Sequence, residues 1–150
     1  MLAATLLGLA LTVASTLIHY EGLKVLNEFL PRLQWVPTRA KLLVVLLAAI
    51  ASHLTQIVLF ALVYYHLRGT FDLGGFAGQT DDGFATYLYF SAEAYTTLGL
   101  GDVYPLGPMR LITGLESLIG LLMIGWTPRP LPTWKCAATG IDPGNFTQAT

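Results

Sequence analysis

The residues best suited to chemistry form one short run, Thr96-Thr97-Leu98-Gly99-Leu100-Gly101-Asp102. A cation that leaves water needs protein oxygens in place of its hydration shell, and backbone carbonyls serve only if successive ones point to one axis. A regular strand turns its carbonyls alternately to opposite sides. Gly99 and Gly101, at alternate positions, open the conformations that turn them the same way. The run therefore predicts a cation-binding ring of carbonyls.

Composition places this run in a membrane protein. Of the 150 residues, 54% are hydrophobic and only 11% are charged, whereas soluble domains carry about a quarter charged residues. The net charge of -1 provides no basic face for nucleic acid. A single cysteine, Cys136, excludes an intrachain disulfide and a cysteine-based metal cluster. No arrangement of a catalytic triad, metal-binding histidine pair or aspartate dyad is recognisable, so we expect no enzyme, no cofactor and no small-molecule substrate.

Three apolar segments are predicted to cross the bilayer, which gives an all-α membrane protein. They are an N-terminal helix over 1–19, an outer helix over 42–67 and an inner helix over 109–126. A secretory signal peptide is the alternative for the first, although the start of the chain lacks basic residues. Residues 84–95 are too few to span and predict a re-entrant helix whose negative C-terminal end faces the pore interior. Non-helical backbone at membrane depth is tolerated where it lines a water-filled path, as a filter over 96–102 would.

The remaining segments complete the predicted organisation around a pore unit over 42–126. Residues 20–41 alternate leucines with charges at helical spacing and predict either an amphipathic helix in the membrane interface or a loop helix packed on the spans. Their lysines and arginines favour the cytoplasm, which puts the N-terminus outside and the C-terminus inside a multi-pass cell-membrane protein. Residues 127–150 are proline-rich and aperiodic, and predict a disordered or atypical tail. An out-of-frame reading of the gene's end is a hypothesis that the coding DNA would test.

From Tyr89 to Trp126 the chain resembles the two-helix potassium channel family, because the Thr-Thr-x-Gly-x-Gly-Asp string lies between a short apolar helix and a span. A glycine-rich turn outside the membrane is the plain alternative. The resemblance implies a homotetramer that binds potassium through backbone carbonyls. The implied filter residues are Thr97, Leu98, Gly99, Leu100 and Gly101, with Thr96, Glu93 and Asp102 as support and Gly120 as a candidate hinge. Glu93 and Asp102 match an acid pair that shares a proton or water behind the filter.

Two departures from the family leave alternatives open. Leu100 stands where the family usually has tyrosine or phenylalanine, and leucine cannot hydrogen-bond the filter to the surrounding helices, so selectivity for potassium over sodium stays open. Only Leu121 to Trp126 follow Gly120 before the prolines. A non-conducting or vestigial channel-like subunit with an incomplete inner helix is therefore the alternative function.

Polar residues inside the predicted spans need partners. His53 is either a functional group or a neutral histidine bonded to a neighbouring helix. His19 and His66 are expected at span ends, where their tips meet water. Glu116 is expected to face either the pore or a neighbouring helix, where Ser117 or a threonine hydroxyl could be its donor. It is interpreted as having a structural or pore-vestibule role and not as a site.

Overall fold

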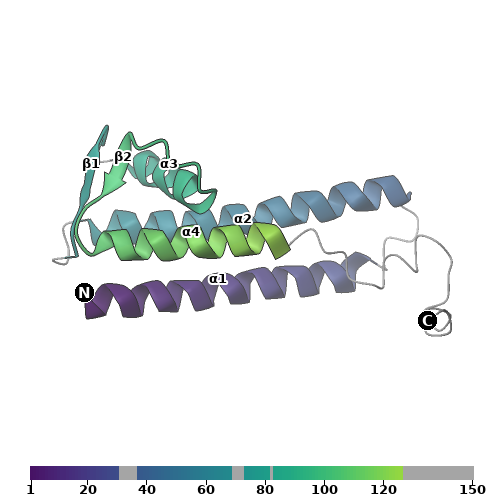
Figure 1. Cartoon of the computed structure of the whole chain (residues 1–150). Coiled ribbons are helices and arrows are strands. Elements are labelled where there is room, and N and C mark those ends of the chain that lie inside the picture. The colour runs from purple at the N-terminus through teal and green to yellow at the C-terminus, as the bar shows by residue number, and fades with distance from the viewer. Residues whose placement is uncertain (31–36, 69–72, 82, 127–150) are drawn as a thin grey trace, which may run out of the picture.

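The computed structural model describes residues 1–30, 37–68, 73–81 and 83–126. In chain order these form α1 (Leu2–Phe29), α2 (Thr38–Leu67), β1 (Phe76–Gly78), α3 (Phe84–Tyr95), β2 (Val103–Pro105) and α4 (Met109–Trp126). The long helices α1, α2 and α4 lie roughly side by side (Figure 1). The short helix α3 and the two strands lie on the side of α2 and α4 that faces away from α1.

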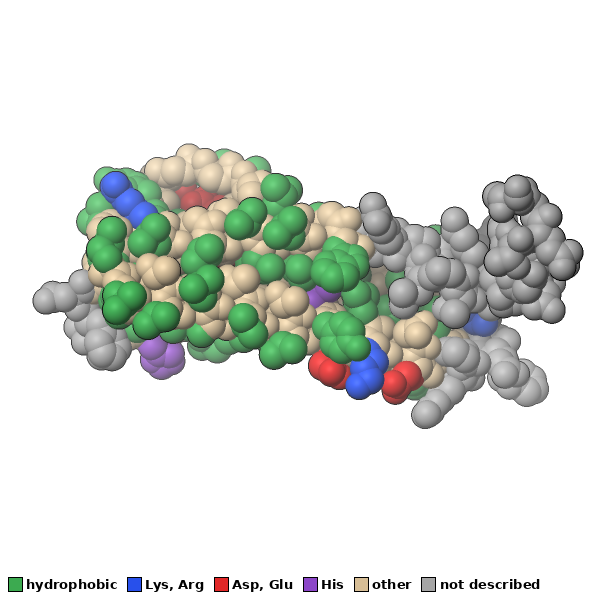
Figure 2. Space-filling view, turned by 60° about the horizontal axis from the view of Figure 1, so that its bottom comes forward, with side chains coloured by type: hydrophobic (Ala, Val, Ile, Leu, Met, Phe, Trp, Pro, Cys, Tyr) green, Lys and Arg blue, Asp and Glu red, His purple; other side chains and the backbone are tan. Residues whose placement is uncertain are grey.

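The predicted all-α membrane architecture is confirmed. Three described helices are long and apolar enough to cross a bilayer, at Leu2–Phe29, Ala40–Leu67 and Met109–Trp126. Many large hydrophobic side chains on them are exposed, such as Leu46 at 58% and Leu121 at 58%. Figure 2 shows hydrophobic side chains spread over the visible face, with the charged ones gathered toward its two ends. Such a surface suits hydrocarbon rather than water.

The first two helices differ in their bounds from the sequence prediction. The N-terminal helix was expected to end at residue 19, but α1 runs without interruption to Phe29. The sequence has no proline before Pro31 that would interrupt this helix. Helix α2 begins at Thr38 rather than at residue 42. The residue before it, Pro37, has an extended backbone and is the N-cap of the helix. The rest of the predicted linker (31–36) and the tail (127–150) lie outside the described residues.

A small antiparallel sheet joins the two ends of the segment that holds α3. Phe76 pairs with Pro105 and Gly78 with Val103. Gly78 is required there, since its φ is +103° and a Cβ would come within 1.9 Å of the Asp102 carbonyl oxygen. The sheet therefore fixes where the chain leaves the loop after α3.

An aromatic cluster fills the space between the sheet, α2 and α3. The Phe76 and Phe90 ring centroids are 4.8 Å apart, and Tyr64 lies 5.3 Å from Phe76 and 5.5 Å from Phe90, all edge to face. This geometry is favoured for aromatic pairs. The cluster holds α3 at a fixed depth against α2.

Candidate functional site

Helix α3 ends in a hydrogen-bonded cap that leads straight into the Thr96–Asp102 loop. The Thr97 N–H donates to the Ala94 carbonyl (3.1 Å) and the Leu98 N–H donates to the Glu93 carbonyl (2.9 Å). These two bonds form a Schellman motif, whose left-handed position is usually a glycine. Here Thr97 occupies it, with a φ of +59°. A β-branched residue in this region costs about 1–3 kcal/mol, which marks the position as a candidate for function.

Left-handed backbone recurs at every second residue of the loop. The φ angles are +59° at Thr97, +56° at Gly99 and +82° at Gly101, whereas those of Leu98 and Leu100 are not positive. A Cβ added at either glycine would meet nothing within 4 Å. The glycines are therefore needed for conformation and not for space. Alternation between positive and negative φ is the backbone pattern that can turn successive carbonyls toward one side.

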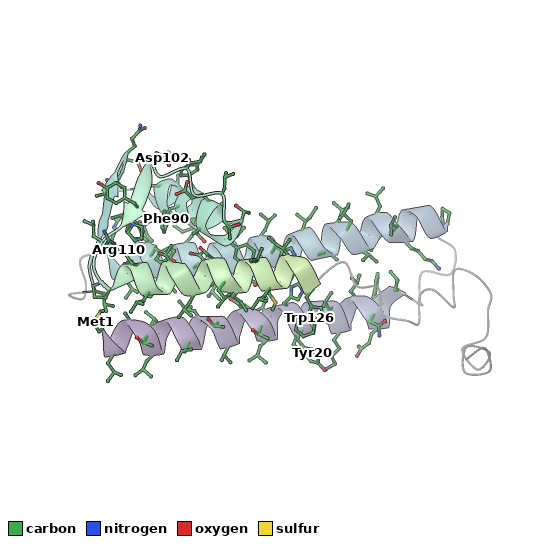
Figure 3. The ribbon with its side chains drawn as sticks, viewed as in Figure 1. Met1, Tyr20, Phe90, Asp102, Arg110 and Trp126 are labelled. Carbon is green, nitrogen blue, oxygen red and sulfur yellow. The ribbon has the colours of Figure 1, made fainter. Side chains whose placement is uncertain are left out.

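The C-terminal end of the loop is held at Asp102, which is bonded from two sides. The Tyr89 hydroxyl on α3 donates to both carboxylate oxygens of Asp102, at 3.0 and 3.2 Å. The Asp102 carbonyl accepts a bond from the Gln79 N–H next to β1 (2.7 Å). Figure 3 shows Asp102 beside the strands, at the far side of the bundle from α1. The sequence marked Asp102 as filter support, but it did not identify Tyr89 or Gln79.

Glu93 lies in the same region and is almost fully buried, at 4% exposed. Its Oε2 has no hydrogen-bond partner among the described residues. Burial, and after it the negative charge of Asp102, raises the pKa of Glu93 above its ordinary value. An electrostatic coupling of this sort is what an acid pair behind a filter requires.

The inner helix α4 contacts the last turn of α3 directly. The Ser117 hydroxyl donates to the Ala94 carbonyl (2.9 Å). One helical turn further on, a Cβ at Gly120 would lie 2.1 Å from the Tyr95 carbonyl oxygen. Helix α4 continues through Gly120 without a break. Close packing is therefore an observed reason for this glycine, while its role as a hinge stays a prediction.

Glu116 joins three helices, with partners other than those expected. Its carboxyl group is fully buried and contacts the Tyr64 hydroxyl of α2 and the Ser91 hydroxyl of α3, each at 2.5 Å. The expectation of Ser117 or a threonine was wrong, because Ser117 bonds the Ala94 carbonyl instead. The available signal was Ser91, a hydroxyl in the middle of an apolar helix. The interpretation of His53 as bonded to a neighbouring helix is confirmed by its contact with the Tyr95 hydroxyl (3.0 Å).

Comparison with known proteins identifies the family of this chain. Residues 52–131, just over half of the chain, match a family described as ion channels. The chain belongs to the two-helix pore-domain ion-channel family. No curated protein and no solved structure matches the chain. The matched segment includes the second half of α2 together with α3, the loop and α4, so this channel carries α1 in addition to the family's pore unit.

A hollow lies beside the Thr96–Asp102 loop, between the loop, α3 and α4. It has a volume of about 350 Å³ and is lined on its polar side by Glu93, Thr97, Thr113 and Ser117. Next to it, Leu98 and Leu100 are 64% and 61% exposed.

Proposed function

We propose that this channel conducts monovalent cations, most readily potassium, through a filter formed by residues 97–101 of four identical subunits in the cell membrane. The observation that carries the proposal is the left-handed backbone at Thr97, Gly99 and Gly101, directly after a capped helix. The proposed ligands are the carbonyls of residues 97–100 with the Thr97 hydroxyl, which replace the water around the ion. No bond to substrate is made or broken.

The tetramer follows from what one subunit lacks. One loop supplies a quarter of a ring of carbonyls, so a single chain cannot surround an ion. The hollow beside Thr97 and the exposed Leu98 and Leu100 side chains are the surface that a neighbouring subunit would cover. We assign Thr96, Glu93 and Asp102 to the support of the filter. The N-terminus and the sheet lie at the same end of the bundle, and we propose that this end faces outward (Figure 1).

Potassium flux into proteoliposomes, with barium as a blocker, tests this function. Gly99→Ala and Gly101→Ala should each abolish flux, because alanine strongly disfavours their positive φ. Gly75→Ala is the matched control, since it too has open space around it and its backbone is outside the left-handed region. Flux that survives both filter substitutions would contradict the proposed ion path. Replacement of potassium by sodium in the same assay measures what Leu100 does to selectivity.

A non-conducting subunit is the second candidate. The observation in its favour is the length of α4, which has 18 described residues against 30 in α2. An assembled tetramer that passes no potassium under any gradient would support it and would refute conduction.

A further inference from the structure

A buried polar cluster lies where α1, α2 and α3 meet, beneath the start of the filter. It contains His19 from α1, Ser52, His53 and Gln56 from α2, and Tyr95, the last residue of α3. His19 was expected at a wet span end, but it is buried at 2% exposed, and Gln56 and Tyr95 are fully buried. Polar side chains in the membrane interior are costly unless bonded, so such a cluster needs an explanation.

The bonds of Tyr95 set a direction through the cluster. Its hydroxyl has one hydrogen, which it donates to Gln56 Oε1 at 2.9 Å. The contact between the Tyr95 hydroxyl and His53 Nδ1 (3.0 Å) therefore uses a hydrogen carried by His53. Because Gln56 accepts through its oxygen, its amide nitrogen is left to donate.

The donor groups of α2 converge on His19. Gln56 Nε2 lies 3.4 Å and Ser52 Oγ 3.3 Å from His19 Nδ1. The Gln56 amide nitrogen can only donate, so this contact requires that Nδ1 carries no proton and accepts, whereas the Ser52 hydroxyl can donate or accept. The His19 ring also stacks on His53, with centroids 5.2 Å apart. The path runs from α1 through Gln56 to the hydroxyl of Tyr95.

Tyr95 transmits this contact to the filter, because it is the residue before Thr96. Its carbonyl oxygen packs against Gly120 of α4, and its hydroxyl is held by Gln56 and His53 of α2. A shift of its ring therefore displaces the end of α3, where the filter begins.

We propose that His19 is a positioning residue for conduction, which holds the end of α3 in place by accepting the Gln56 amide that binds Tyr95. This inference rests on the conduction proposed above. Helix α1 up to residue 29 lies outside the segment that matches the family, so the contact extends the pore unit of this chain.

Acid should release the contact. A proton on His19 Nδ1 turns the acceptor into a donor that faces the Gln56 amide, which can only donate, while the Ser52 hydroxyl can turn to accept. His53 of α2 stacks on the His19 ring, Tyr95 of α3 contacts His53 and Gln56, and the acid on α4 is Glu116. On α1 itself, Glu21 and Lys24 form an exposed pair.

Two substitutions of His19 separate its bonding from its bulk. Asparagine places an amide oxygen near the position of Nδ1 and cannot titrate, whereas leucine fills the space and accepts nothing. Single-channel recordings in planar bilayers should show H19L with a roughly tenfold lower open probability than the wild type, as expected for one lost hydrogen bond, and with a changed potassium-to-sodium permeability ratio. H19N should stay near the wild type at neutral pH.

The pH profile supplies the second readout. As the pH falls and His19 gains a proton, the wild type should lose open probability and H19N should lose less. His66→Asn, at the end of α2, is the matched control and should follow the wild type. Assembly of each variant is checked by size-exclusion chromatography.

Each outcome bears on one proposal. A conducting wild type with an indifferent H19L refutes the positioning role alone. H19N as impaired as H19L refutes the acceptor argument, and an unchanged acid response in H19N refutes the role of the His19 proton. A wild type that assembles but never conducts refutes conduction and, with it, this inference.

Discussion

The buried carboxyl of Glu116 is predicted to act as a neutral bridge between α2, α3 and α4. Ser91 has a single hydroxyl hydrogen but two close acceptors, the Ile57 carbonyl at 2.8 Å and Glu116 at 2.5 Å. Both contacts are satisfied when Ser91 donates to Ile57 and the carboxyl itself supplies a hydrogen to Ser91. Tyr64 then donates to the other carboxyl oxygen.

Glutamine and leucine at position 116 should therefore differ sharply. Gln can donate its amide to Ser91 and accept from Tyr64, so E116Q keeps both contacts and should cost less than about 1 kcal/mol. E116L leaves Tyr64 with only Thr113 Oγ1, at 3.4 Å, while Ser91 retains Ile57. One unmatched buried hydroxyl costs about 1–3 kcal/mol, and a second interhelical bond lost in a membrane adds about 0.6 kcal/mol. We expect E116L to lose about 2–3 kcal/mol.

Denaturant unfolding of the detergent-solubilised protein measures these free energies. Tyr64→Phe removes one donor and should account for part of the E116L loss, whereas Tyr65→Phe is a control of the same kind on the next residue. Equal damage from E116Q and E116L would show that the negative charge is required, and would refute the neutral bridge. Two unaffected variants would refute the bridge altogether.

Two further predictions concern the ends of the filter loop. Gly120→Ala should reduce tetramer yield and flux and destabilise the fold by about 1–3 kcal/mol, because its Cβ would overlap the Tyr95 carbonyl oxygen, 2.1 Å away. Gly125→Ala is the control, since a Cβ there would meet nothing within 4 Å. Equal behaviour of the two variants in flux and unfolding would disprove the packing argument. For Glu93, burial and Asp102 raise the pKa, so its contribution to stability is complete below its ordinary value near 4.5 and is lost as pH rises through the raised one. Glu93→Gln should flatten this decline in a pH series of melting temperatures, and an identical slope in both proteins would count against it.

The elements of the pore unit were predictable because their signals are local. Helix α3 (Phe84–Tyr95) and helix α4 (Met109–Trp126) have the bounds expected from apolar runs closed by glycines and prolines. The alternate glycines at 99 and 101 likewise showed where left-handed backbone would occur. Thr97 gave no such signal, because its conformation comes from the hydrogen bonds of the α3 cap and not from its own preference.

Long-range pairings could not be read from local patterns. The partners of Glu116 lie 25 and 52 residues away in sequence, at Ser91 and Tyr64. The bounds of α1 were missed for another reason. A change from an apolar run to an amphipathic one after residue 19 suggested two segments, but such a change alters which side is buried without interrupting backbone hydrogen bonds.

The pairing of β1 with β2 bears on the order of assembly. It ties the residues before α3 to those after the Thr96–Asp102 loop, so the segment from Gln79 to Asp102 is a closed loop within one chain. The entropy cost of closing a loop of this length is then met when the single chain folds. In the proposed tetramer, subunits that dock afterward bring together preformed loops, and the association step needs only to align them.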